Sequence, residues 1–184
     1  MRILLVGANG QVGDALVRSL APLGEVVATT RSGMLPGGAA CAALDLHDAH
    51  AIAALVAQAR PDAVVNAAAY TAVDRAEDDI DGAYAINAAA PGVLARACAD
   101  IDATLIHYST DYVFDGAGES PYRPDAPTAP LGVYGASKLA GEHAVAASGA
   151  HHLILRTAWV YGLYGANFLR TMLRVGQERD ELRV

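Results

Sequence analysis

Three glycines near the N-terminus restrict the fold of this chain more than any other feature. Gly7, Gly10 and Gly13 follow the apolar run Ile3–Val6 directly and lead into an amphipathic stretch over Gln11–Ala21. The first glycine permits a tight turn, the second lets the backbone approach a pyrophosphate, and the third allows close packing of helix on strand. The start of such a helix also offers unpaired amides and a positive dipole end to phosphates. The pattern predicts a strand, turn and helix that bind a dinucleotide, with ordinary turn glycines as the alternative.

The rest of the sequence alternates between short apolar runs and longer segments with helical periodicity. This alternation is typical of a doubly wound parallel sheet of the Rossmann type, an α/β fold with helices on both faces. Hydrophobic residues make up 53% of the 184 residues and charged residues 18%, which excludes disordered and fibrous classes. We expect strands at Ile3–Val6, Glu25–Thr29, Ala40–Leu44, Ala63–Asn66, Thr104–Tyr108 and His152–Thr157. We expect helices at Gln11–Ala21, Ala49–Ala59, Gly82–Ala99 and Tyr134–Ala147.

Two segments depart from the alternation. Residues 115–132 contain Pro121, Pro124, Pro127 and Pro130, which cannot join a central sheet and stiffen a loop. Loops of this length often form the lid or wall of a site. From Ala166 to Val184 the sequence becomes helical and charged and then ends, which we interpret as an early end. We therefore expect one domain over residues 1–165 and the beginning of another part over 166–184.

Charge and cysteine content exclude several partners. The formal net charge of −7 argues against a nucleic-acid surface, which needs clustered Lys and Arg. Cys41 and Cys98 are too few for a disulfide framework or a thiolate metal site, and His151 and His152 lack matching carboxylates, so we expect no metal. No apolar stretch approaches a membrane span or a signal peptide. We expect a soluble, cytoplasmic protein that does not contact membranes.

The end of the second expected strand bears on the choice of cofactor. NAD-selective sites usually place Asp or Glu there, whereas this strand ends Thr29-Thr30-Arg31. A guanidinium can pair with a ribose 2′-phosphate, which a carboxylate would repel. We therefore favour NADPH, with NADH possible and a solvated loop arginine as the alternative interpretation of Arg31. Asp45 and Leu46, after the third strand, are candidates for contact with the adenine.

A tyrosine and a lysine at helical spacing carry the chemistry that we predict. Tyr134 and Lys138 are four residues apart, so on a helix they share one face. A nearby cation favours phenolate, which brings the pKa of a phenol closer to neutrality. Tyr134 would then give a proton to a carbonyl oxygen while hydride reaches the carbon. Behind a nucleotide-binding loop this interpretation outweighs a chance pair on a helix surface.

Residues after the fifth and sixth strands complete the candidate site. The carboxyl ends of parallel strands form the ligand crevice of such sheets, and Ser109, Thr110 and Asp111 lie there. A hydroxyl of Thr110 or Ser109 could bond a substrate oxygen, or simply cap a turn. Trp159 is a candidate wall of the substrate pocket or a core residue, and His107, within a buried-type strand, is most simply structural.

These motifs resemble the extended short-chain dehydrogenase/reductases, and within them the dTDP-4-dehydrorhamnose reductase family. The similar segments are Gly7–Gly13, Asn66–Asp74, His107–Gly116, Val133–Glu142 and Arg156–Tyr161. The resemblance implies reduction of the 4-keto group of dTDP-4-dehydro-6-deoxy-L-mannose to dTDP-L-rhamnose, with Tyr134 as proton donor, Lys138 binding the nicotinamide ribose and Thr110 assisting. It implies cofactor contacts at Gly10, Gln11, Val12, Asp45, Leu46, Ala69, Tyr70, Thr71 and Tyr108. It implies substrate contacts at Thr110, Asp111 and Trp159.

The resemblance also implies limits and alternatives. Family members continue well past this length, so residues 166–184 would begin a truncated substrate-binding subdomain. Some members dimerise through a metal held by carboxylates, one of them at the position of Ala15 here, which leaves a homodimer possible but a metal-linked one doubtful. A nucleotide-sugar epimerase or dehydratase, and a non-catalytic NADP-binding regulatory subunit, are the alternative functions; Arg31 disfavours the first, and retention of Tyr134 with Lys138 the second.

Overall fold

A six-stranded parallel sheet organises the computed structural model, which describes residues 1–162, 165–179 and 181. The strands stand in the order β3-β2-β1-β4-β5-β6. Both halves of the sheet therefore grow outward from β1 and β4, which is the doubly wound arrangement that we expected. The strands span Arg2–Val6 (β1), Glu25–Thr30 (β2), Ala42–Ala43 (β3), Ala63–Asn66 (β4), Thr104–Thr110 (β5) and His152–Thr157 (β6).

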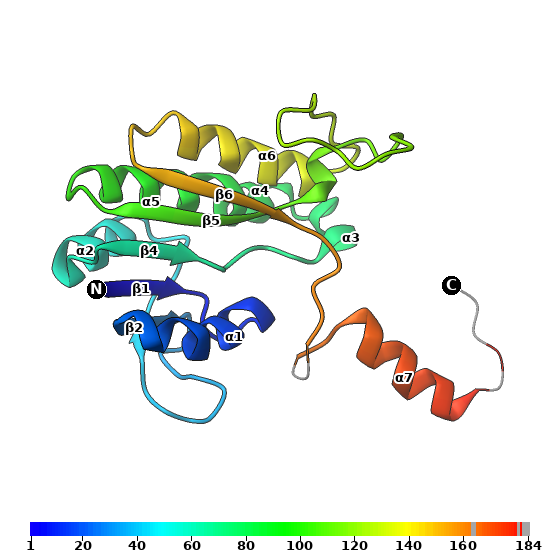
Figure 1. Ribbon diagram of the computed structural model, residues 1–184, viewed down its shortest axis with the longest axis horizontal. Helices are drawn as coiled ribbons and strands as arrows, with labels where there is room; N and C mark the ends of the chain where they lie inside the picture. Colours follow the sequence, from blue (N-terminus) through cyan, green and yellow to red (C-terminus); the bar gives the residue numbers. More distant parts are fainter. Residues whose placement is uncertain (163–164, 180, 182–184) are drawn as a thin grey trace.

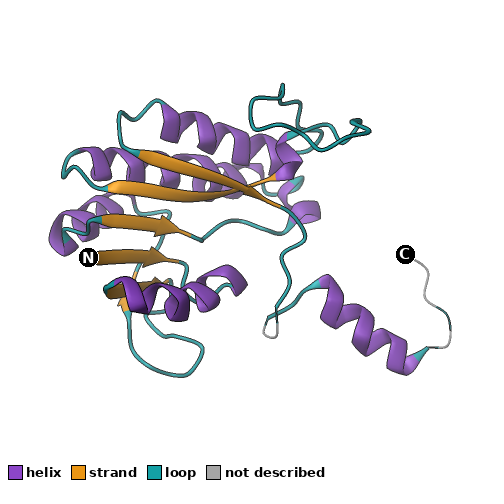
Figure 2. Ribbon diagram, viewed as in Figure 1, coloured by secondary structure: helices purple, strands orange, loops and turns teal. Residues whose placement is uncertain are grey.

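Helices cover both faces of the sheet (Figures 1 and 2). Helix α1 packs on one face through Leu16, Val17 and Leu20, against Ile3 and Leu5 of β1. The opposite face carries the larger core, in which α2 and α5 bring residues such as Ile52, Val56 and Leu94 against Leu4 and Val64. The helices span Gln11–Leu20 (α1), Ala49–Ala59 (α2), Val73–Ala76 (α3), Ile80–Tyr84 (α4), Ala90–Ala99 (α5), Val133–Ala146 (α6) and Phe168–Glu178 (α7).

The expected helix over Gly82–Ala99 begins two residues earlier and is not uniformly α-helical. Helix α4 passes into a π-helical turn at Ala85–Ala89 (η2), which continues as α5. Pro91 directly follows the π-helical turn within this continuous helix, and its missing N–H removes one helical hydrogen bond there. The short helix α3 was not predicted, and the third strand covers only the centre of the expected Ala40–Leu44. Both errors concern segments too short for a periodicity to show.

The carboxyl ends of all strands point to one edge of the sheet, where the loops that carry the candidate site gather (Figure 1). The proline-rich loop 115–132 lies above the same edge, beside α6 (Figure 2). Helix α7 lies apart from the layers of the sheet on this side. No helix in the described ranges is long and apolar enough to cross a membrane.

Candidate active site

The glycine loop has the geometry that the sequence predicted. Gly7 has a φ of +84°, and a Cβ there would lie 2.7 Å from the backbone nitrogen of Ala68. A Cβ on Gly13 would collide with the carbonyl oxygen of Gly7, so this glycine is needed for α1 to pack against the turn. At Gly10 a Cβ would meet only Gly7 O, at an ordinary 3.5 Å. Gly10 is therefore dispensable for packing, and its bare backbone serves the adjoining cleft.

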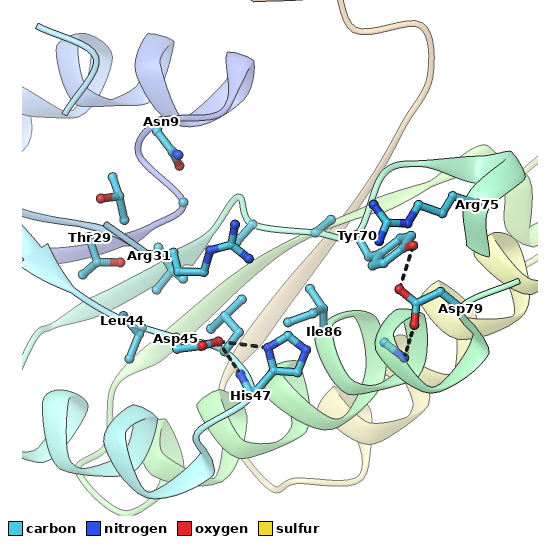
Figure 3. A pocket seen from close by; sticks show the side chains of 17 residues that line it. Asn9, Thr29, Arg31, Leu44, Asp45, His47, Tyr70, Arg75, Asp79 and Ile86 are labelled. Atoms are coloured by element: carbon cyan, nitrogen blue, oxygen red, sulfur yellow. Dashed lines mark hydrogen bonds and ion pairs between the residues drawn. The ribbon is translucent and has the colours of Figure 1, made fainter. Parts of the chain in front are cut away.

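Two cavities, of about 500 and 530 Å³, meet at this loop and share Gly7, Asn9, Ala68 and Ala69. The first extends over β2 and the start of α2 (Figure 3). Its walls include the predicted cofactor residues Arg31, Asp45, Leu46, Ala69 and Tyr70. The second extends toward α6 and contains the predicted residues Gly10, Gln11, Val12, Thr71, Tyr108, Thr110, Asp111, Tyr134, Lys138 and Trp159. One cleft thus brings these residues together, with Gly13 buried behind its floor.

The first cavity carries a cluster of polar side chains near Arg31. Asp45 Oδ1 accepts from the backbone N–H of His47 at 3.0 Å and lies 2.9 Å from His47 Nδ1. These bonds, together with the charge of Arg31, lower the pKa of Asp45. Arg75 of α3 also lines this cavity, opposite Arg31 (Figure 3). His47 and Arg75 were missed, because neither belongs to a motif and the loops that bring them here have no periodicity.

Tyr134 and Lys138 face the second cavity from one side of α6, but their charges are not coupled as we expected. Lys138 is only 1% exposed, and its Nζ donates to the carbonyl oxygen of Tyr108 at 2.6 Å. Burial lowers the pKa of Lys138 to about 8, although the Glu142 carboxylate opposes this. The pKa of Tyr134 is raised, chiefly by burial, and partly lowered by a hydrogen bond with Thr110.

The prediction that Lys138 lowers the pKa of the Tyr134 phenol is therefore wrong for this structure. The reason is the direction of the lysine side chain, which runs to β5 rather than to the phenol. The raised pKa keeps the phenol protonated near neutral pH, although it also makes the phenol a weaker acid.

Thr110 stands beside Tyr134 at the end of β5. Its Oγ1 accepts from the backbone N–H of Tyr112 at 3.2 Å and donates to Asp111 Oδ1 at 3.2 Å. The hydroxyl thus caps the short turn Asp111–Val113 and also contacts the phenol. The turn-cap interpretation of this hydroxyl is confirmed, and Thr110 also lines the second cavity, while its contact with a substrate stays a prediction. Asp111 is exposed at the mouth of the cavity.

A buried asparagine in the π-helical turn joins two walls of the cleft and was missed by the sequence analysis. Asn87 Oδ1 accepts from the Tyr70 backbone N–H at 2.8 Å, while its Nδ2 donates to Tyr70 O at 3.1 Å and to Ser137 Oγ at 3.0 Å. Ser137 in turn donates to the carbonyl oxygen of Tyr134 at 2.8 Å. The irregular turn thus places one amide between Tyr70, in the wall of the first cavity, and helix α6, and π-bulges often lie at such sites. The sequence signal for this contact was Asn87 itself, a polar residue within the expected helix Gly82–Ala99.

Gln11 joins the glycine loop to a distant part of the chain. Its Nε2 donates to Ala166 O at 2.8 Å, and its Oε1 accepts from Asn167 Nδ2 at 2.9 Å. Asn167 also caps α7, where its Oδ1 accepts from the Arg170 N–H. Gln11 lines the cleft as predicted, but its amide is engaged by the 166–167 segment.

Trp159 lies at the outer end of the second cavity. Its side chain is 74% exposed, its φ is +50°, and its ring contacts Phe168 edge-on at 5.2 Å. A core role is therefore wrong for this residue, and a wall of the cavity fits.

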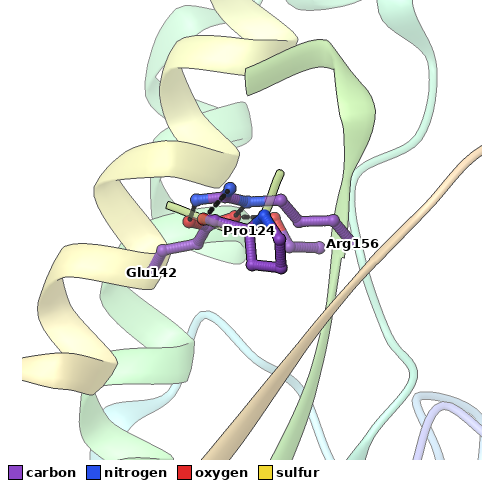
Figure 4. A network of polar contacts seen from close by, with 4 residues as sticks. Pro124, Glu142 and Arg156 are labelled. Atoms are coloured by element: carbon purple, nitrogen blue, oxygen red, sulfur yellow. Dashed lines mark hydrogen bonds and ion pairs between the residues drawn. The ribbon is translucent and has the colours of Figure 1, made fainter. Parts of the chain in front are cut away.

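Glu142 of α6 and Arg156 of β6 form an ion pair whose hydrogen bonds also reach β5 and the proline-rich loop (Figure 4). Glu142 accepts from Arg156 Nε at 2.9 Å and Nη2 at 2.6 Å, and from Ser109 Oγ at 2.6 Å. Arg156 Nη1 also donates to the carbonyl oxygen of Pro124 at 3.1 Å. Ser109 lines the second cavity next to Thr110, but its hydroxyl is engaged by Glu142. The network fixes the end of β5 and the proline-rich loop to α6.

Among the described residues, no group of three or more His, Cys, Asp or Glu side chains could hold a metal ion. Cys41 and Cys98 are free thiols. Cys98 is buried in the main core, and burial raises its pKa to about 12.

The sequence profile of one family, the RmlD substrate binding domain, matches residues 1–184. The chain belongs to this family. Three similar proteins match the whole chain: dTDP-4-dehydrorhamnose reductases of Burkholderia thailandensis (51% identical) and Escherichia coli K12 (48%), and the spore coat polysaccharide biosynthesis protein SpsK of Bacillus subtilis (40%). The chain covers 58%, 60% and 62% of their lengths, so it spans about three fifths of the RmlD-family proteins that it resembles.

Solved structures of proteins named dTDP-4-dehydrorhamnose reductase also superpose on this chain. A dTDP-4-dehydrorhamnose reductase of Clostridium acetobutylicum superposes with a TM-score of 0.90 at 39% identity, over 99% of this chain and 61% of the other. That of Bacillus anthracis, solved in complex with NADP, superposes with a TM-score of 0.87 at 37% identity, over 97% and 60%. The Rossmann-type fold predicted from the sequence is confirmed.

Proposed function

We propose that this chain carries the cofactor cleft and the catalytic pair of an NADPH-dependent dTDP-4-dehydrorhamnose reductase. The observation that carries the proposal is one cleft in which the glycine loop, Thr110, Tyr134 and Lys138 meet. Relatives up to 51% identical bear the name dTDP-4-dehydrorhamnose reductase, and one similar structure holds NADP. The reaction would convert the 4-keto group of dTDP-4-dehydrorhamnose into the hydroxyl of dTDP-L-rhamnose.

The cleft fits a dinucleotide. The space that a side chain at Gly10 would take is open to the cavity, and α1 begins there with amides that lack helical partners. Arg31 and Arg75 border the first cavity, where a 2′-phosphate would be neutralised, which favours NADPH over NADH. The predicted contacts from Asp45, Leu46, Ala69, Tyr70, Thr71 and Tyr108 fit the same cleft.

In this proposal the cofactor supplies the hydride, and the chain supplies the proton and the orientation. Tyr134 O–H donates to the oxygen of the substrate carbonyl, and its raised pKa keeps the proton available near neutrality. Thr110, beside Tyr134, donates its hydroxyl hydrogen to the same oxygen. Lys138 offers a buried cation toward the nicotinamide ribose, and Asp111 and Trp159 border the place for the sugar.

Replacing Tyr134 tests the chemistry. Removal of a general acid typically lowers rates by about 10²–10⁴-fold, so Tyr134→Phe should lose at least about 100-fold in kcat. The full natural polypeptide should consume NADPH with dTDP-4-dehydrorhamnose, measured by absorbance, while the Phe variant binds NADPH with unchanged affinity in a fluorescence titration. Equal turnover of the two proteins would refute the assignment, and NADPH binding without turnover of the wild type would favour a regulatory subunit.

Replacing Arg31 tests the cofactor preference. The guanidinium would pair with the 2′-phosphate, which only NADPH carries, so Arg31→Ala should weaken NADPH about 10-fold or more and leave NADH nearly unchanged. Titration of both cofactors into both proteins gives the ratio. Arg60→Ala, far from the cleft at the end of α2, is a matched control for the loss of one charge. An unaltered ratio in Arg31→Ala would mean that this arginine does not select the cofactor.

We also propose the division of the chain into a dinucleotide-binding catalytic domain at residues 1–165 and the start of a substrate-binding part at 166–184. The position of α7 apart from the sheet supports this boundary (Figure 1). A nucleotide sugar is the proposed partner; a homodimer stays a prediction, which light scattering of the full polypeptide would test.

A further inference from the structure

A buried imidazole separates the catalytic lysine from the interior of the sheet. His107 of β5 is fully buried, and its register partner on β4 is Asn66. Asn66 Nδ2 lies 3.1 Å from His107 Nδ1, and Lys138 Nζ lies 3.4 Å from His107 Nε2. The three side chains form a row from the centre of the sheet to the cleft, and the reaction proposed above uses only the last of them.

The backbone determines which way the amide of Asn66 faces. Its Oδ1 accepts from the N–H of Ala68 at 3.2 Å, so its amino group must face His107. An amide nitrogen only donates, and therefore Nδ1 of His107 must accept. The ring is neutral, since burial and the charge of Lys138 lower its pKa to about 3. A neutral ring that accepts at Nδ1 carries its proton on Nε2.

This tautomer turns an N–H toward Lys138, which has only donors when charged. The 3.4 Å approach is then a contact without a hydrogen bond. Among the described residues, the Lys138 ammonium donates to one oxygen, the backbone carbonyl of Tyr108. The titratable side chains around Lys138 are His107 and Tyr108 on β5 and Tyr134 and Glu142 on α6, and the Glu142 carboxylate is engaged by Arg156 and Ser109.

We propose that His107 is a positioning residue for Lys138. The Ala68 amide fixes Asn66, Asn66 fixes the Nε2–H tautomer of His107, and this N–H denies the ammonium a second partner in the interior. The two N–H groups that Tyr108 does not use are therefore left for oxygens in the cleft. The proposal rests on the proposed function only in treating Lys138 as catalytic; the tautomer and its effect on Lys138 belong to the chain itself.

The tautomer can be measured without any substrate. In the 184-residue chain labelled with ¹⁵N-histidine, long-range ¹H–¹⁵N spectra distinguish protonated from unprotonated ring nitrogens, and the loss of one of the six signal sets in His107→Gln assigns His107. We expect an unprotonated Nδ1 and a protonated Nε2, unchanged from about pH 5 to about pH 9. A protonated Nδ1, or a ring that titrates in this range, would overturn the proposal.

The effect on Lys138 can be measured equally directly, because Lys138 is the only lysine in the sequence. ¹³C-lysine labelling therefore gives one side-chain signal whose pH titration reports one ammonium. In His107→Gln the amide oxygen can accept from Lys138, so its pKa should rise by about one unit or more. His107→Asn is the matched control: it keeps an acceptor for Asn66 but is too short to reach Lys138, and its Lys138 should titrate close to wild type.

An unchanged Lys138 pKa in His107→Gln would mean that Nε2 already accepts from the ammonium, contrary to the proposal. The wild-type tautomer decides the question even if a variant fails to fold. Both measurements use the cofactor-free chain, so a wrong reductase assignment would leave them intact, and a wrong tautomer would leave the Tyr134→Phe test intact.

Discussion

At the scale of the residue, the three loop glycines look equivalent in sequence but serve different purposes. Gly13 is required by packing against Gly7 O, whereas the space beside Gly10 belongs to the cleft. Gly13→Ala forces a methyl group into backbone and should cost at least about 2 kcal/mol in the free energy of unfolding. Gly10→Ala should stay within about 1 kcal/mol of wild type but weaken NADPH about 10-fold or more.

Urea denaturation and cofactor titration of the two variants separate these effects. Each variant serves as the control of the other, since both replace a glycine by alanine within one turn of α1. Loss of stability in Gly10→Ala with no loss in Gly13→Ala would contradict this division of roles.

Some residues of the site could be predicted because a local sequence pattern places them, and others could not. Tyr134, Lys138 and Thr110 could be predicted, because a helix phase and a strand end place them without reference to the rest of the fold. Asn87, His47 and Arg75 could not, because the π-helical turn, the short loop and the four-residue helix α3 that place them depend on packing. The direction of Lys138 depends on the Tyr108 carbonyl, a contact between elements that spacing along one helix does not encode.

At the scale of the elements, the Glu142–Arg156 pair holds β5, α6, β6 and the proline-rich loop together. The Arg156 guanidinium also lies 4.9 Å from the centroid of the Phe114 ring, which stacks on Tyr122 of that loop at 4.3 Å. Glu142→Ala leaves the arginine without its carboxylate; because the Glu142 side chain is buried but that of Arg156 is 23% exposed, the loss should exceed the ~1 kcal/mol of an exposed pair and stay below the ~3–5 kcal/mol of a fully buried one. Thermal and urea unfolding should register this loss.

The exposed pair Arg123–Asp125, in the same loop, is the control. Asp125→Ala should change stability little, because solvent screens exposed ion pairs. Similar losses of stability in Glu142→Ala and Asp125→Ala would mean that burial of the Glu142 carboxylate does not strengthen its ion pair. Hydrogen exchange should also rise over residues 115–132 in Glu142→Ala alone, since only that variant releases the Pro124 contact.

Elements were predictable where their periodicity was long. The sheet strands and helices α1, α2 and α6 lie within a few residues of the expected ranges, because each buries one face against a continuous core. Helix α3 and the two-residue β3 carry too few residues for a pattern. The π-helical turn could not be predicted, because its residues have ordinary helix propensities. In the structure it places the Asn87 amide in hydrogen bonds with Tyr70 and Ser137.

At the scale of the whole molecule, buried groups tie stability to pH. The pKa of His107 falls from 6.5 to about 3 on folding. Between these values the unfolded chain binds the proton and the folded chain does not, so stability decreases as pH falls from 6.5 toward 3. At about 1.4 kcal/mol for each pKa unit, this group alone should cost about 3 kcal/mol by pH 4.

Urea unfolding at several pH values tests this linkage in wild type and His107→Asn. The wild type should lose about 3 kcal/mol more than the variant between about pH 7 and about pH 4. Parallel curves for the two proteins would show that folding does not lower the pKa of His107. Lys138 has the same sign in the alkaline range: its pKa is lowered from 10.5 to about 8, so between these values the unfolded chain binds the proton and the folded chain does not, and stability rises with pH.

The single lysine has a practical consequence for attaching this molecule to a surface. Within residues 1–184 the amines are the N-terminus and Lys138, of which Lys138 is 1% exposed and Met1 66% exposed. Met1 precedes β1 at the amino edge of the sheet, and the cleft lies at the carboxyl edge (Figure 1). For a polypeptide of these 184 residues, amine-reactive coupling should therefore attach each molecule through Met1 and in one orientation, with the cleft open to the solution.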